Sequence, residues 1–105
     1  MNYTLSATFT QKRVFITGAG SGLGKALSLA LARDGWTIGI SDFNQLLLEE
    51  TRQGIHALGA SAYAYALDVS DREKYQQVAR QFLADAGGID VLINNAGIGD
   101  GGNFE

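Results

Sequence analysis

The sequence predicts an α/β protein built on one doubly wound parallel sheet. Apolar, strand-like runs alternate with segments of helical period along the 105 residues. A glycine-rich stretch stands between the first strand-like run and the first helix, and polar residues follow the later runs. Strands that are joined by helices form parallel sheets with right-handed crossovers, so we expect the spatial order third, second, first, fourth.

The expected elements follow one another without an internal repeat or linker. Strands are expected at residues 13–17, 36–41, 60–67 and 89–94. The intervening helices each carry an apolar face: Leu23, Ala26, Leu27, Ala30 and Leu31 in the first, Leu47, Thr51, Ile55 and Leu58 in the second, and Tyr75, Val78, Ala79, Phe82, Leu83 and Ala86 in the third. The fourth strand is apolar on both faces, which is typical of a buried parallel strand.

Capping residues and glycines mark the expected helix ends. Asn44 is a candidate N-cap for the second helix. Ser70 and Glu73 have the spacing of an S-x-x-E capping box before the third helix. Glycines that favour a left-handed conformation follow each helix, at Gly35, at Gly59 and at Gly87 with Gly88.

Composition excludes several classes of function. A chain of this length forms one domain at most. Its eight basic residues are scattered along the sequence and the net charge is −3, so no nucleic-acid partner is expected. The longest leucine run, at residues 46–48, is far too short to span a membrane, and the first eleven residues do not resemble a secretory signal. There is no cysteine, and the lone histidine, His56, is expected to be a solvated or partly packed helix residue, so no metal site is expected. A cytoplasmic location is the expectation that follows.

The stretch TGAGSGLG, at residues 17–24, has glycines that can let a phosphate approach the backbone. A Walker A loop would require glycine at Ala19 and a hydroxyl at Ala26, so that loop is excluded. The G-x-G-x-x-G fingerprint fails because its last glycine falls on Leu23. The stretch fits T-G-x-x-x-G-x-G, and a glycine-rich turn without a ligand is the alternative.

Three further motifs follow the later strands: Asp42 after the second, LDV at residues 67–69 after the third, and NNAG at residues 94–97 after the fourth. With the glycine loop, they make the chain resemble the N-terminal part of a classical short-chain dehydrogenase/reductase, over roughly residues 11–105. The resemblance implies a truncated, Rossmann-like fold. It divides the chain into an extension at residues 1–11 and an adenosine-binding portion at residues 12–105.

The resemblance also implies which residues bind the dinucleotide cofactor. The pyrophosphate would lie on the loop, and the adenine ring against Asp68 and Val69. Asn94 would tie the central strands together. The loop residues concerned are Gly18, Ser21, Gly22, Leu23 and Gly24, and the residues expected beside the nicotinamide-side ribose are Asn95, Ala96 and Gly97.

Asp42 predicts the kind of cofactor. A carboxylate after the second strand can accept hydrogen bonds from both adenosine ribose hydroxyls and repels a 2′-phosphate. Relatives that prefer the phosphorylated cofactor usually carry a basic residue where this chain has Ser21 or Phe43. The sequence therefore favours NAD over NADP. The alternative is that Asp42 merely starts the turn toward Asn44.

The residues that carry out hydride transfer in this family are not in the sequence. The family uses a serine and a Tyr-x-x-x-Lys pair, and none of the tyrosines, Tyr3, Tyr63, Tyr65 and Tyr75, has a lysine four residues later. We therefore expect no catalytic residue and no activity from this chain alone.

Two hypotheses of function follow. In the first, the chain is the NAD(P)-binding part of an oxidoreductase that transfers hydride between NAD(P) and an alcohol or ketone. In the second, it is a complete short protein that binds a nucleotide or a partner and catalyses nothing. In either case the fourth strand would be an apolar sheet edge, so self-association through that edge is expected.

Overall fold

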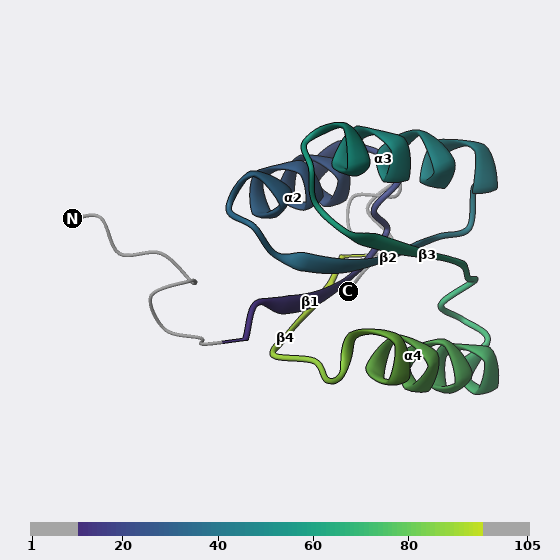
Figure 1. Cartoon of the computed structure of the whole chain (residues 1–105). Helices are drawn as coiled ribbons and strands as arrows, with labels where there is room; N and C mark the ends of the chain where they lie inside the picture. The colour runs from purple at the N-terminus through teal and green to yellow at the C-terminus, as the bar shows by residue number, and fades with distance from the viewer. Residues whose placement is uncertain (1–10, 96–105) are drawn as a thin grey trace.

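The computed structural model describes residues 11–95 and contains one four-stranded parallel sheet with three helices. The elements alternate as predicted: β1 (Arg13–Thr17), α2 (Gly22–Arg33), β2 (Thr37–Asp42), α3 (Gln45–Ala57), β3 (Ala62–Ala66), α4 (Arg72–Ala86) and β4 (Val91–Asn94). The sheet order is β3-β2-β1-β4, which confirms the predicted topology. Helices α2 and α3 cover one face of the sheet and α4 covers the other (Figure 1).

The strand register brings polar residues together at one edge of the sheet. Thr17, the last residue of β1, pairs with Ser41 of β2 and with Asn94 of β4. The glycine loop leaves β1 at the same point, and Asp42 ends β2. The carboxyl ends of the three strands therefore lie beside the loop, as expected for a ligand site in an open α/β sheet.

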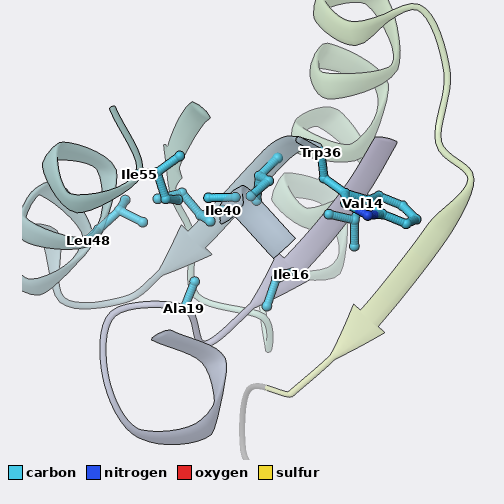
Figure 2. Packing of buried hydrophobic residues seen from close by; sticks show 9 residues of the cluster. Val14, Ile16, Ala19, Trp36, Ile40, Leu48 and Ile55 are labelled. Atoms are coloured by element: carbon cyan, nitrogen blue, oxygen red, sulfur yellow. The ribbon is translucent and has the colours of Figure 1, made fainter. Parts of the chain in front are cut away.

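The sheet face under α2 and α3 is mostly aliphatic, apart from the ring of Trp36, and almost fully buried (Figure 2). We call this the aliphatic face; its buried residues are Val14, Ile16, Ala19, Ala32, Trp36, Ile38, Ile40, Leu48 and Ile55. Helix α2 meets it through the small residues Gly24, Ser28 and Ala32, which let the helix approach the strands closely.

The predicted apolar stripe of α2 is therefore partly wrong. Leu23, Ala26 and Ala30 are exposed, while Leu27 and Leu31 are half-buried at the sides of the true contact face. Pattern reasoning favoured the larger side chains, whereas a helix that lies this close to a sheet needs small ones. Similarly, α3 buries Leu48 rather than Leu47 and leaves Leu58 exposed, and Leu83 of α4 is exposed.

The opposite sheet face, under α4, is built around aromatic rings, and we call it the aromatic face. Its buried residues are Phe15, Leu67, Val78 and Phe82, with Tyr63 and Tyr65 packed beside them. The rings of Phe15 and Phe82 lie 5.5 Å apart. Gly39 of β2 makes room for them, because a Cβ atom there would lie 2.6 Å from Phe82 and 2.7 Å from Phe15.

The helix ends follow the predictions with one exception. The Asn44 side chain accepts a hydrogen bond from Leu47 N at 3.0 Å, and Gly35, Gly59 and Gly87 all have positive φ. The capping box of Ser70 and Glu73 is wrong. Asp71 caps α4 by accepting from Lys74 N, and Ser70 instead donates its hydroxyl to Asp68.

Strand β4 lies at one edge of the sheet and, within residues 11–95, pairs only with β1. Its burial alternates, and Leu92 is 56% exposed, so it is not buried on both faces as expected. No helix in this part of the chain combines the length and the apolar character needed to cross a membrane.

Candidate functional site

The glycine loop between β1 and α2 adopts a conformation that requires its glycines. Gly18 and Gly22 have φ of 66° and 57°, in the left-handed region that favours glycine. At Gly24, a Cβ atom would overlap the carbonyl oxygen of Gly18 and lie 2.7 Å from Asn95 Nδ2. The structure therefore requires glycine at all three positions of the T-G-x-x-x-G-x-G pattern, at Gly18 and Gly22 because of their φ angles and at Gly24 because there is no room for a side chain.

The N-terminus of α2 begins directly at this loop and keeps backbone donors available. Ser21 is the N-cap residue, but its side chain makes no capping hydrogen bond. No acidic residue stands in the first turn of α2, and both Ser21 and Gly22 are exposed. Free N–H groups and the positive end of a helix dipole are the features that bind a phosphate.

Asp42 is held against the loop by backbone hydrogen bonds. Its Oδ2 accepts from Gly20 N and its Oδ1 accepts from Asn44 N, both at 2.8 Å. The approach is so close that a Cβ atom on Gly20 would lie 2.8 Å from Asp42 Oδ2 and 2.9 Å from Leu47 Cβ. The structure thus adds Gly20 to the candidate site. Sequence reasoning missed it because Gly20 lies outside the pattern, although the extra glycine was a signal.

The loop is also tied to β4 and to α3. Asn95 Nδ2 donates to Gly18 O at 3.1 Å, and Thr51 Oγ1 donates to Ala19 O at 3.0 Å. Thr17 Oγ1 donates to Asn94 Oδ1 at 3.0 Å, which joins β1 to β4, the role expected of Asn94. Thr51 was expected only as part of an apolar helix face, and its hydroxyl proves to be a support for the loop.

Asp68 and Val69 lie after β3 and are not hydrogen-bonded to the loop in the part of the chain that the structure describes. Asp68 Oδ1 accepts from both the hydroxyl and the backbone N–H of Ser70, and these bonds lower the pKa of its carboxyl group. Val69 is half-buried beside the aromatic face. Leu23, also predicted in the site, is 61% exposed at the start of α2.

Two predicted site residues, Ala96 and Gly97, lie outside the described residues. Among residues 11–95, no group of three or more histidine, aspartate or glutamate side chains is placed to hold a metal ion. His56 is exposed on α3, as expected.

Comparison with known proteins identifies the family. The sequence model of the short chain dehydrogenase family matches residues 12–105. The chain belongs to the short-chain dehydrogenase family.

Individual proteins that the chain resembles show how much of such a protein it covers. "Probable oxidoreductase EphD" of Mycobacterium tuberculosis is 45% identical over 96 residues, which are 91% of this chain but 16% of that protein. The crystal structure of a short chain dehydrogenase from Mycobacterium smegmatis superposes with a TM-score of 0.79 and 35% identity, over 85% of this chain and 38% of that one. NAD+-bound xylitol dehydrogenase gives a TM-score of 0.75 with 33% identity, over 77% of this chain and 31% of that one.

The two solved structures share the fold of the described region, and xylitol dehydrogenase is a complex with NAD+. A nicotinamide dinucleotide is therefore the class of cofactor that the comparisons indicate. The chain spans only a minor part of the length of each relative.

Proposed function

We propose that this chain forms the adenosine and pyrophosphate half of an NAD site in an oxidoreductase that acts on an alcohol or ketone. When bound, NAD accepts or supplies the hydride. The part of this chain is to bind and orient the dinucleotide. The glycine loop with Ser21 and Leu23 would hold the pyrophosphate at the α2 N-terminus, and Asp68 with Val69 would border the adenine. Asn95, Ala96 and Gly97 would continue the site toward the second ribose.

The position of Asp42 is the observation that carries the preference for NAD. Each carboxylate oxygen has about two acceptor positions, and the backbone N–H groups of Gly20 and Asn44 take one on each oxygen. One position per oxygen is left, which matches the two hydroxyls of an unmodified ribose. A 2′-phosphate at that place would meet a fixed negative charge beside a loop without a basic residue, since Ser21 and Phe43 occupy the relevant positions.

The test is a calorimetric titration of the 105-residue chain with NAD and with NADP. We expect NAD to bind more tightly, and Asp42→Asn to weaken NAD binding by about tenfold while bringing the two affinities closer, because a hydrogen bond to a charged acceptor is lost. Glu50→Gln removes an exposed carboxylate from α3 outside the site and serves as the matched control. Tighter binding of NADP than of NAD by the unmodified chain would overturn the preference.

We further infer that this chain alone does not transfer hydride, because the sequence holds no Tyr-x-x-x-Lys pair. Mixed with NAD and a panel of alcohols, it should bind the cofactor without forming reduced cofactor, as followed by absorbance. Turnover above the rate without protein would contradict this inference. The family assignment does not favour the alternative of a non-catalytic interaction protein. The cytoplasmic location stays a prediction.

Self-association through β4 is part of the same proposal. Within residues 11–95, no strand pairs with the outer side of β4, and Leu92 beside it is exposed. Sedimentation of the chain at increasing concentration should show species larger than a monomer, and Leu92→Lys should reduce them because a charged residue protects an edge. A monomer at all concentrations would rule out this part of the proposal.

A further inference from the structure

The other edge of the sheet, strand β3, has a sequence that is unusual for an exposed edge. Within the described residues β3 pairs only with β2, and every residue from Ala62 to Ala66 is partly or fully exposed. The strand reads Ala-Tyr-Ala-Tyr-Ala, with no charged residue and no proline. Natural sheets usually protect an edge with such residues, because an unprotected edge pairs with other chains.

The hydrogen bonds to β2 show which backbone groups of β3 are free. Ile38 N donates to Ser61 O, and Leu67 N donates to Asp42 O, both at 3.1 Å. The N–H and C=O groups of successive residues in a strand point in opposite directions, so those of the odd-numbered residues from 61 to 67 point toward β2. The N–H and C=O groups of Ala62, Ala64 and Ala66 therefore point away from the sheet.

The free edge is self-complementary because the five residues form a palindrome. In an antiparallel pair centred on Ala64, each alanine faces an alanine of the second chain, and Tyr63 faces Tyr65. Ala64 would pair with Ala64, and Ala62 with Ala66, in hydrogen-bonded positions that use the outward backbone groups. The alanine side chains are small and uncharged, so they neither clash with nor repel those of the second chain.

The two tyrosine side chains of β3 lie on the α4 side of the sheet. The tyrosines lie over the aromatic face, where the Tyr65 hydroxyl donates to Asp85 Oδ2 at 2.6 Å. A shallow groove of about 230 Å³ runs between β3 and α4, lined by Tyr65, Lys74, Gln77, Val78 and Gln81. Tyrosines that face each other across two strands add to the pairing energy of a sheet.

We propose that β3 is a homotypic docking strand, which pairs with β3 of a second copy of this chain in an antiparallel, twofold-symmetric register centred on Ala64. The contact joins two sheets into one continuous sheet. It involves only five residues from each chain, so the association is weak and depends on concentration. The proposal does not depend on cofactor binding.

The test uses disulfide formation at single positions, which is favoured by the absence of cysteine from the natural chain. In the proposed register the Cα atoms of two Ala64 residues lie about 5.5 Å apart, within the range that a disulfide spans. Two copies of residue 62 lie about 14 Å apart, as do two copies of residue 66, because each is displaced from its counterpart by four residues along the strand as well as across the pair.

We therefore expect Ala64→Cys to form a covalent dimer under mild oxidation several-fold faster than Ala62→Cys or Ala66→Cys alone. A mixture of the Ala62→Cys and Ala66→Cys chains should form the heterodimer, which is the control for register. All variants carry Leu92→Lys, which suppresses contacts through β4, and each is first shown to unfold cooperatively. Equal rates for the three single variants, or no covalent dimer in any of them, would overturn the proposal.

Discussion

The two faces of the sheet are buried in different ways. The aliphatic face lies under two helices and distributes its burial over nine residues, from Ala19 of the glycine loop to Trp36, whose side chain is the largest that is fully buried among the described residues. The aromatic face lies under α4 alone, and only Val78 and Phe82 of that helix are buried. The aliphatic face therefore supports the candidate site directly, whereas the aromatic face depends on one ring for much of its packing. Substitutions on the two faces should affect stability and cofactor binding in different proportions.

The largest expected effect is on the aromatic face. Phe82 contacts the rings of Phe15, Tyr63 and Tyr65, with centroids between 5.5 and 6.4 Å away. Phe82→Ala should lower the free energy of unfolding by about 3–5 kcal/mol, which urea denaturation would measure. The milder Phe82→Leu should fold and bind NAD with unchanged affinity. A loss of NAD affinity in the folded Leu variant would remove the distinction between the two faces.

A smaller loss of stability, with a clear loss of binding, is expected at Thr51. Thr51 is fully buried, and its hydroxyl is the hydrogen-bond donor to Ala19 O. Thr51→Val should cost about 1–3 kcal/mol, because the carbonyl group is left without its donor. It should also weaken NAD binding by loosening the loop. Thr51→Ser keeps the hydroxyl and should restore most of the affinity; if Ser and Val bind NAD equally, the hydrogen bond does not support the loop.

The smallest effect is expected at the far end of the sheet. Arg13 Nε contacts Asp90 Oδ2 at 2.8 Å, and the Arg13 guanidinium also donates to Gly87 O. The hydrogen bond from Arg13 holds the pKa of Asp90 below its usual value. The stabilising contribution is therefore present above the ordinary pKa of an aspartate and is lost as the pH falls through the lowered value.

Asp90→Asn should thus be slightly less stable than the unmodified chain near neutral pH, and the difference should disappear in acid. Urea denaturation at several pH values would measure it, with Glu49→Gln as the control for an exposed ion pair on α3. A difference that grows as the pH falls would contradict the assignment. NAD affinity should not change, because this ion pair lies at the opposite end of β1 from the glycine loop.

The fold could be predicted from sequence because its signals are local and repeated. Hydrophobic period, the cap at Asn44 and the glycines after each helix all point to the same alternation of strands and helices, and the crossover rule then determines the sheet order. The choice between two neighbouring candidates for the N-cap of α4 was less predictable. Ser70 and Asp71 are both residue types that cap helices; Asp71 caps α4, and the Ser70 hydroxyl donates to Asp68 instead.

The candidate site was predictable only in part, because its supports come from distant segments. The glycine pattern and Asp42 are visible as short motifs, but contacts such as Gly20 with Asp42, or Thr51 with Ala19, join residues far apart in the sequence. A period of 3.6 residues places Thr51 on the inner face of α3 without indicating what its hydroxyl binds. The binding roles of the predicted residues stay predictions.

Gly39 has a consequence for how the sequence can change over time. Its missing side chain leaves space that the rings of Phe82 and Phe15 share, since a Cβ atom at position 39 would lie 2.6 Å from Phe82 and 2.7 Å from Phe15. A larger residue at 39 therefore requires both rings to move or to become smaller. Among related chains the size of residue 39 should covary with the sizes of residues 15 and 82 together.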